Sequence, residues 1–388
     1  MEWESAPRRH AAPPTFSPWE RGWCSRRRHV KQRSVRLLLI SALIITACRA
    51  PSTAPRAEKL DFDAIPGAKL FSEEATLATR WAGPLKTAHD AGQRGTFKGV
   101  ADLEISYLIH RVSTPKAAVV LITGRTEPIR KYAELIEDLN LAGYSTYAVD
   151  HRGQGASGRM LPNPQKGYVA SFDDYVTDLH TFVTTVVKPD TNAKVFLVAH
   201  SMGGAVALLT VDAFPDDFAA VVTTSPMLDI NTGAFPAPIA SSLGAAACGA
   251  SDGSAYAIGS GDFKEEADFS KSTVTQSQAR FDWKRQLFAD SPELRLGGLT
   301  WRWLCESLTA SSNAEQLGRY SSTPTLILQA GKDTVVNAGG QQRYCDAAPR
   351  CQLEVNVGAM HEHYAERDDL RNFAVERTLK FLDAQVKP

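Results

Sequence analysis

A serine stands between an apolar run and a helical pattern in the middle of the chain. Residues 195–200 are mostly apolar and predict a buried strand, and residues 205–211 predict a helix. Between them Ser201 lies in the sequence His-Ser-Met-Gly-Gly. This layout is typical of a nucleophile elbow, a strained turn that holds a serine hydroxyl above a sheet edge. The usual Gly-x-Ser-x-Gly pattern has glycine where this chain has Ala199, and a serine beside glycines is often a plain turn.

A nucleophilic serine needs a base beside it, and the base needs an orienting carboxylate. Asp333 follows the apolar run 325–330, and His361 follows the run 352–357. Parallel strands would deliver both side chains to the sheet edge that carries the serine. The order serine, acid, histidine is one of the known chain orders for such a triad. We therefore predict Ser201 as nucleophile, Asp333 as orienting acid and His361 as general base.

Each of these assignments has an alternative. An aspartate beside a glycine is commonly a turn residue, as Asp333 could be, and His361 could be a solvated loop histidine. Asp229, just after the apolar run 219–225, is a second candidate acid, and His363 is a second candidate base.

A tetrahedral intermediate needs two N–H donors for its oxyanion. We expect one from the backbone of Met202, the residue after the serine. The other is expected from the backbone near Arg125, in the loop after the apolar run 117–122. Because both donors are backbone groups, the side chains there are free to vary.

Strand and helix patterns alternate along most of the chain. Strands are expected at residues 103–110, 117–122, 144–149, 195–200, 219–225, 325–330 and 352–357, and helices at 129–142, 172–187, 205–211, 338–345 and 368–383. Such alternation predicts an α/β fold with a mostly parallel central sheet covered by helices on both faces. The strand-end loop at 150–155 (Asp-His-Arg-Gly-Gln-Gly) is interpreted as a brace of the sheet edge rather than as a second catalytic centre.

The alternation stops between residues 229 and 322. This segment is rich in Gly, Ser and Ala and then in aromatic residues, with no comparable apolar strand. We interpret it as a mainly helical cap insertion over the sheet edge, which divides the core into 97–228 and 323–388. Its aromatic residues could form a local core or line an acyl pocket, and the sequence does not distinguish these two interpretations. They are Phe281, Trp283, Phe288, Trp301 and Trp303.

Residues 1–47 predict an export signal. A basic cluster precedes the uncharged run 37–47, which is too short to span a bilayer and ends in Ile-Thr-Ala before a cysteine. This end of the run resembles a bacterial lipobox, which implies lipid modification of Cys48 and a tether to the membrane surface of a bacterial cell envelope, on the periplasmic or outer-membrane side. A short buried helix is the alternative for this run, and Val30 is an alternative start. Residues 48–96 are expected to be the lipidated cysteine, a linker and irregular or partly helical chain.

Four cysteines lie in the body of the chain, and an even number in an exported protein indicates two disulfides. Cys345 and Cys351 are close in sequence, so we pair them and leave Cys248 with Cys305. Four free thiols would be expected instead if the protein were cytosolic. No His or Cys cluster has zinc-ligand spacing, so no metal is expected.

Composition limits the other partners. The chain has 388 residues, of which 43% are hydrophobic and 22% charged, which is enough for a large core. Its formal net charge is zero, so no nucleic-acid partner is expected. The predicted serine chemistry needs no cofactor.

Short motifs along the chain resemble those of one enzyme family. They are Gly124-Arg-Thr-Glu, Lys131-Tyr132, Asp150-His-Arg-Gly-Gln-Gly, Gly167-Tyr-Val, Phe172-Asp-Asp-Tyr-Val-Thr-Asp-Leu, Ala199-His-Ser-Met-Gly-Gly, Gly331-Lys-Asp and His361-Glu. Over about residues 97–385 the chain resembles bacterial lysophospholipases, in the monoacylglycerol lipase-like branch of the α/β-hydrolases, often labelled serine aminopeptidase S33-type.

The resemblance implies an α/β-hydrolase fold and Ser201, Asp333 and His361 as a triad, with an oxyanion hole at Arg125 and Met202. It also implies a fatty-acyl ester substrate, either a lysophospholipid or a monoacylglycerol. Two alternatives remain: hydrolysis of small esters or peptides, and a non-catalytic lipid-binding envelope lipoprotein on the same fold.

Overall fold

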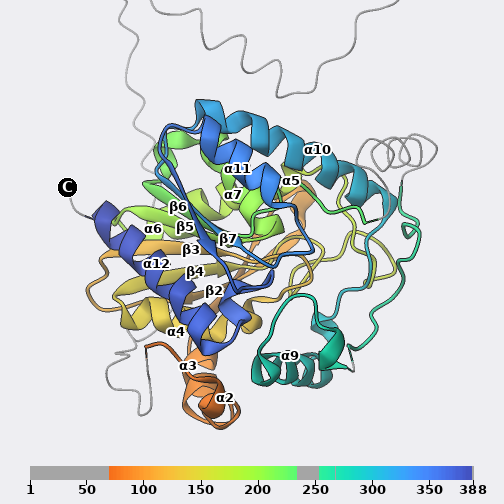
Figure 1. Cartoon of the computed structure of the whole chain (residues 1–388), viewed down its shortest axis with the longest axis horizontal. Coiled ribbons are helices and arrows are strands. Elements are labelled where there is room, and N and C mark those ends of the chain that lie inside the picture. The colour runs from red at the N-terminus through yellow and green to blue at the C-terminus, as the bar shows by residue number, and fades with distance from the viewer. Residues whose placement is uncertain (1–69, 234–252, 267, 387–388) are drawn as a thin grey trace, which may run out of the picture. The chain divides into compact units, whose positions relative to one another are not determined.

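The computed structural model describes residues 70–233, 253–266 and 268–386, and a single sheet runs through this part of the chain (Figure 1). The 8-stranded sheet has the order β1-β2-β4-β3-β5-β6-β7-β8. Its strands are β1 (Gln93–Lys98), β2 (Glu104–His110), β3 (Ala117–Ile122), β4 (Tyr144–Val149), β5 (Val195–His200), β6 (Ala220–Thr224), β7 (Thr325–Ala330) and β8 (Cys351–Asn356). All pairs from β4 to β8 are parallel, and β2 runs antiparallel to β1 and β4. The predicted α/β fold with a mostly parallel sheet is confirmed.

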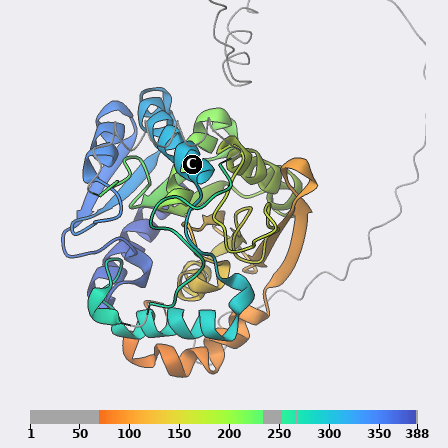
Figure 2. The same ribbon diagram turned by 90° about the vertical axis from the view of Figure 1, so that its right-hand side faces the viewer.

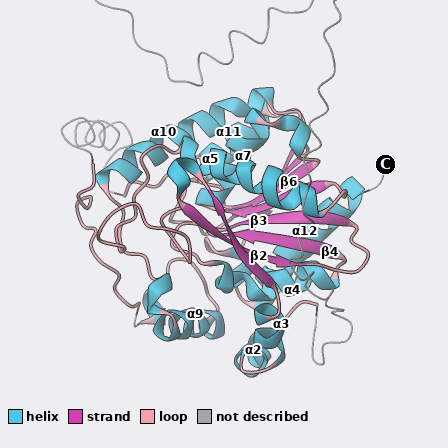
Figure 3. Ribbon diagram, turned by 180° about the vertical axis from the view of Figure 1, so that it is seen from behind, coloured by secondary structure: helices cyan, strands magenta, loops and turns pink. Residues whose placement is uncertain are grey.

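Helices cover both faces of this sheet, which is why every residue of β3, β4 and β5 is buried (Figure 3). The longer helices are α4 (Ala133–Leu141), α5 (Asp173–Phe182), α7 (Met202–Ala213), α9 (Gln278–Asp290), α10 (Trp301–Leu317), α11 (Ala338–Ala347) and α12 (Asp368–Val386). Helices α5, α7, α10 and α11 pack on one another in one layer. Helices α4 and α12 form the other layer and share its main apolar core with the strands. The chain after α5 continues through a π-helical turn, Val183–Val187, into the short helix α6 (Lys188–Asp190).

The segment before residue 97 is more regular than expected. It contains α2 (Glu74–Trp81), α3 (Pro84–Asp90) and most of β1. Strand β1 pairs only with β2, and its side chains alternate between half-buried and exposed. An edge strand of this kind (Gln-Arg-Gly-Thr-Phe-Lys) lacks the apolar run that marks the central strands, so the sequence pattern does not reveal it.

Within its described residues, the segment between β6 and β7 contains two long helices in different places. Helix α9 packs on α2, and Figure 2 shows the two helices side by side. Helix α10 instead packs on α7 and α11, in the layer over the sheet rather than above its edge. Its buried residues recur about once per helical turn and so lie along one face of the helix: Trp303, Ser307, Ala310, Ser311 and Ala314. Helix α10 lies in the segment that we expected to form the cap, but it is part of the helical layer that covers the sheet.

The aromatic residues of this segment also divide. Trp283 and Phe288 of α9 pack with Leu77, Leu85 and Leu294 in a small separate core. Trp303 of α10 is buried beneath the guanidinium of Arg125. The interpretation that the aromatic residues form a local core is therefore confirmed for α9.

Cys345 at the end of α11 and Cys351 at the start of β8 form the expected disulfide. The export segment, Cys48 and Cys248 lie outside the described residues, so lipid modification and the pairing of Cys248 with Cys305 stay predictions. In the ranges given above, no helix is both long enough and apolar enough to cross a membrane.

Candidate active site

Ser201 occupies the turn from β5 into α7, with φ 52° and ψ −118°. A non-glycine residue in this left-handed region is strained, as a nucleophile elbow requires. The turn closes because Gly203 and Gly204 lack side chains. A Cβ on Gly203 would lie 2.4 Å from the Thr123 carbonyl oxygen, and one on Gly204 would lie 2.7 Å from Pro226 Cβ. Helix α7 can therefore begin against the end of β3.

The structure brings the three residues of the predicted triad together. His361 Nε2 lies 2.8 Å from Ser201 Oγ, and His361 Nδ1 lies 2.8 Å from Asp333 Oδ2. Asp333 Oδ1 accepts hydrogen bonds from the backbone N–H groups of Val335 and Val336, at 2.8 and 3.1 Å. With the proton on Nδ1, His361 donates to Asp333 and accepts from the serine hydroxyl. This arrangement can remove the hydroxyl proton and stabilise the imidazolium that results.

The charges around the triad suit this proton transfer. Burial alone would raise the pKa of Asp333, but the hydrogen bond and charge of His361 hold it below its ordinary value. Asp333 is therefore anionic at neutral pH. Burial lowers the pKa of the nearby His200 to about 4 and that of His363 to about 3, so both are neutral and add no competing positive charge.

Neither rival residue joins the site. The ring nitrogens of His363 have no hydrogen-bond partner within the part of the chain that the structure describes. Asp229 accepts a hydrogen bond from Asn337 at 2.8 Å and pairs with Arg343 at 2.9 Å. Asn337 caps the start of α11 and Arg343 lies in its middle, so this carboxylate ties the loop after β6 to α11 instead of orienting the base.

The two expected oxyanion donors lie at the ends of β3 and β5. Met202 is the first residue of α7, and the N–H groups of the first helical turn have no acceptor within the helix. The side chain of Arg125 points toward the insertion, where Nη2 donates to the Gly297 carbonyl oxygen at 2.9 Å. Its guanidinium lies 4.9 Å from the ring centroid of Trp303, and burial lowers the pKa of Arg125 to about 10. The Arg125 side chain thus anchors the loop to the insertion, and its backbone N–H remains the expected oxyanion donor.

A buried carboxylate that the sequence analysis did not identify holds this loop. Glu127 Oε2 accepts hydrogen bonds from the backbone N–H of Gly124, at 2.9 Å, and from the hydroxyl of Tyr132. A Cβ on Gly124 would lie 2.4 Å from the same oxygen. The family-like motifs at 124–127 and 131–132 therefore meet at one carboxylate, beside the residue expected to supply an oxyanion donor.

A lysine links this carboxylate to the histidine loop. Lys131 pairs with Glu127 and, at 2.7 Å, with Glu362, the residue after His361. Burial would raise the pKa of Glu127, but Lys131 and His200 hold it well below its ordinary value. The resulting chain of buried charges joins the loop after β3 to the loop after β8. Only the spacing of Glu127 and Lys131, four residues apart, is visible as a signal in the sequence.

The loop that carries His361 is also held from the side of the insertion. Glu366, which has no exposed surface, accepts hydrogen bonds from the backbone N–H groups of Met360 (2.7 Å) and Gln276 (3.0 Å). The Thr275 hydroxyl donates to the Ala365 carbonyl oxygen at 2.6 Å. The short stretch before α9, which contains Thr275 and Gln276, therefore fixes the position of the loop that carries His361.

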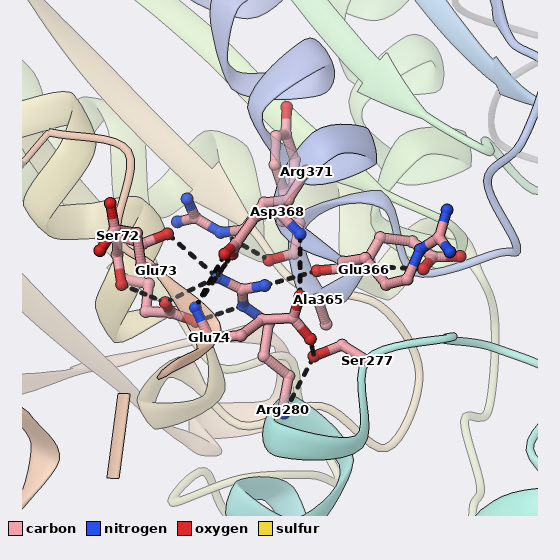
Figure 4. A network of polar contacts seen from close by, with 12 residues as sticks. Ser72, Glu73, Glu74, Ser277, Arg280, Ala365, Glu366, Asp368 and Arg371 are labelled. Atoms are coloured by element: carbon pink, nitrogen blue, oxygen red, sulfur yellow. Dashed lines mark hydrogen bonds and ion pairs between the residues drawn. The ribbon is translucent and has the colours of Figure 1, made fainter. Parts of the chain in front are cut away.

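Arg280 in the first turn of α9 completes this connection (Figure 4). Its guanidinium donates to Glu134 at 2.9 Å, to the Glu366 carbonyl oxygen at 2.6 Å, to Asp368 at 3.0 Å and to the Ser72 carbonyl oxygen at 3.1 Å. One buried arginine thus joins α9, α4, the start of α12 and the segment before α2.

The strand-end loop at 150–155 braces the sheet edge, as expected. Asp150 accepts hydrogen bonds from the backbone N–H groups of Ile129 (2.8 Å) and Ala156 (2.9 Å). Arg152 forms a two-pronged pair with Asp178, at 2.7 and 2.8 Å. Each of these groups is fully used in holding the loop.

A cavity of about 240 Å³ lies beside the triad loops. We call it the charged pocket, because five basic and five acidic side chains line it. Thr126 and Glu362, which directly follow Arg125 and His361, belong to its lining, together with Lys284 and Arg295 from the insertion. Across the described ranges, no group of three or more His, Cys, Asp or Glu residues is arranged to hold a metal ion.

The chain is similar to known hydrolases over most of its length. The family model described as serine aminopeptidase, S33, matches residues 113–368. Lysophospholipase L2 of Escherichia coli K12 is 33% identical over 326 residues, which cover 82% of this chain and 95% of the relative. Human monoglyceride lipase is 26% identical over 264 residues, covering 67% of this chain and 80% of the relative. A solved structure of a yeast monoglyceride lipase variant in complex with a substrate analogue superimposes with a TM-score of 0.62, at 18% identity over 76% of this chain and 96% of that one, and shows the shared fold.

Proposed function

The chain belongs to the serine aminopeptidase S33 family of hydrolases, and from this premise we propose that it hydrolyses the fatty-acyl ester of a lysophospholipid or a monoacylglycerol at Ser201. The observation that carries the proposal is the pair of 2.8 Å hydrogen bonds that join Ser201, His361 and Asp333. The names of the relatives, which include lysophospholipases and monoglyceride lipases, support the substrate class.

The reaction runs through an acyl-enzyme. His361 Nε2 takes the proton of Ser201, whose Oγ attacks the acyl carbonyl carbon. The tetrahedral oxyanion accepts hydrogen bonds from the backbone N–H groups of Met202 and Arg125. His361 then gives its proton to the departing alcohol oxygen, and the acyl group stays on Ser201. A water molecule, deprotonated by His361, attacks that ester and releases the fatty acid.

The place of action belongs to the same proposal. We infer from the sequence before residue 49 that a lipid on Cys48 tethers the enzyme to an envelope membrane, where such substrates lie. Each buried methylene of such an anchor contributes about 0.8 kcal/mol of membrane affinity.

The proposal is tested by measuring fatty-acid release from a lysophospholipid and a monoacylglycerol, and p-nitrophenol release from esters of acetate to palmitate. The folded wild type is expected to favour long acyl chains, and Ser201→Ala is expected to lose activity by several orders of magnitude. Preference for short chains would point to a small-ester hydrolase. No turnover on any ester would favour the non-catalytic lipid-binding alternative.

A further inference from the structure

We propose that the charged pocket binds the phosphodiester head group of a zwitterionic lysophospholipid, so that the enzyme prefers this substrate to a monoacylglycerol. The inference rests on the proposed function, since it concerns the part of the ester substrate that departs as the alcohol.

The position of the pocket relative to the triad indicates the departing side of the substrate. His361 must give a proton to the alcohol oxygen, so this oxygen has to lie within hydrogen-bond distance of Nε2. The residue next to His361, Glu362, lines the charged pocket, as does Thr126 next to Arg125. A head group attached to that oxygen is therefore expected to extend toward the pocket.

The size and lining of the pocket do not suit a long acyl chain. Its volume of about 240 Å³ is smaller than the ~300–1,000 Å³ that encloses a drug-sized ligand, so it takes only part of a lipid. Five basic and five acidic side chains line it, and an acyl chain there would cover charges without pairing them. Equal numbers of both signs match a group that carries one phosphate and one ammonium.

Arg295 is a partly buried cation of the pocket that forms no ion pair with the described residues. Its Nε donates to the Phe288 carbonyl oxygen at 2.7 Å, and its guanidinium carbon lies 5.2 Å from the Phe263 ring centroid. Among the residues that the structure describes, it has no carboxylate partner and no other hydrogen bond. Its terminal nitrogens therefore keep parallel N–H groups that match two oxygens of a phosphate.

Lys284 supplies a second cation beside it. Its side chain is only 14% exposed and pairs at 3.1 Å with Glu266, whose side chain is 60% exposed. An ion pair to such an exposed carboxylate is weak, so Lys284 can exchange it for a phosphate oxygen at little cost. Glu266 is then free to face the ammonium. The glycerol of a monoacylglycerol offers no charge to either residue.

The test compares kcat/KM for 1-palmitoyl-lysophosphatidylethanolamine with kcat/KM for 1-palmitoylglycerol, which have the same acyl chain. The ratio is measured for wild type, Arg295→Gln, Arg295→Lys and Arg319→Gln. Arg319 is a matched control outside the pocket, because its Nε also donates to a backbone carbonyl oxygen, at 2.9 Å, and its guanidinium also lies over a ring, at 5.4 Å.

The wild-type ratio is expected to exceed one, and Arg295→Gln is expected to lower it about 10- to 100-fold, the range of a lost charge-assisted hydrogen bond. Arg295→Lys should retain part of the preference for the lysophospholipid, and Arg319→Gln should leave the ratio of the two kcat/KM values unchanged. Hydrolysis of both substrates with the same ratio in Arg295→Gln as in wild type would overturn the head-group assignment alone. Hydrolysis of neither substrate by the folded wild type would overturn the proposed function and this inference with it.

Discussion

Replacing Arg280 with methionine tests whether one buried arginine holds the insertion to the core. The Arg280 side chain is 1% exposed and that of its partner Glu134 is 6% exposed. Removal of one partner from a buried ion pair costs about 3–5 kcal/mol, because the remaining charge stays buried without its counter-ion. Glu134 also feels the charge of Arg371, so we expect the lower end, about 3 kcal/mol. For a folded unit of this size, a loss of about 3 kcal/mol lowers the Tm by roughly 4 °C.

The same pair predicts a pH dependence of stability. Burial alone would raise the pKa of Glu134, but Arg371 and Arg280 lower it to about 2, from an ordinary value of 4.5. A lowered carboxyl pKa contributes stability above the unfolded-state value and loses it as the pH falls through the folded-state value. The shift corresponds to roughly 3 kcal/mol, lost between about pH 4.5 and pH 2. In Arg280→Met this acid-dependent part should be smaller.

The assay is urea unfolding of wild type, Arg280→Met, Glu134→Gln and the double variant at pH 7 and pH 4. The two substitutions should couple by about 1–3 kcal/mol, because the neutral glutamine no longer needs the arginine. Arg285→Met is the matched control on α9, since Arg285 is 34% exposed and pairs with Glu265 at the surface. Its cost should stay within about 0.5 kcal/mol. A cost of Arg280→Met as small as this, or additivity of the two changes, would refute the reasoning.

Two further predictions concern the triad and the loop after β3. Asp333→Asn leaves the shape intact but favours the wrong tautomer of His361, so kcat on p-nitrophenyl butyrate should fall about 10⁴-fold; a loss below tenfold would remove Asp333 from the triad. Glu127→Gln cannot accept from Gly124 and Tyr132 and also pair with Lys131, so the oxyanion donor should shift. We expect kcat to fall about tenfold or more with KM little changed, since the oxyanion contact acts in the transition state. An unchanged kcat with a raised KM would instead assign Glu127 to substrate binding.

The positions of the triad residues could be predicted because parallel strands order them. Ser201, Asp333 and His361 each follow an apolar run, and the carboxyl ends of parallel strands meet at one edge of the sheet. Local spacing alone leaves His363 as a second candidate base. The difference lies in which ring reaches Ser201, and that depends on how the loop after β8 is folded.

The hydrogen bonds that hold that loop could not be predicted from local sequence. Glu366 accepts from Gln276, a residue 90 positions away, and Arg280 reaches Ser72 across 208 positions. Polar residues at such separations give no periodic signal. The position of α10 could not be predicted for a related reason, because its buried face includes Ser307 and Ser311 and gives no clear apolar periodicity.

The measurement that tests the central claim most directly is mass spectrometry of the enzyme after acid quench during turnover of p-nitrophenyl palmitate. The account predicts a mass increase of one palmitoyl group on the peptide that contains Ser201, weak or absent in Ser201→Ala. A palmitoyl group on another residue, or full turnover by Ser201→Ala, would contradict the assignment of Ser201 as the nucleophile.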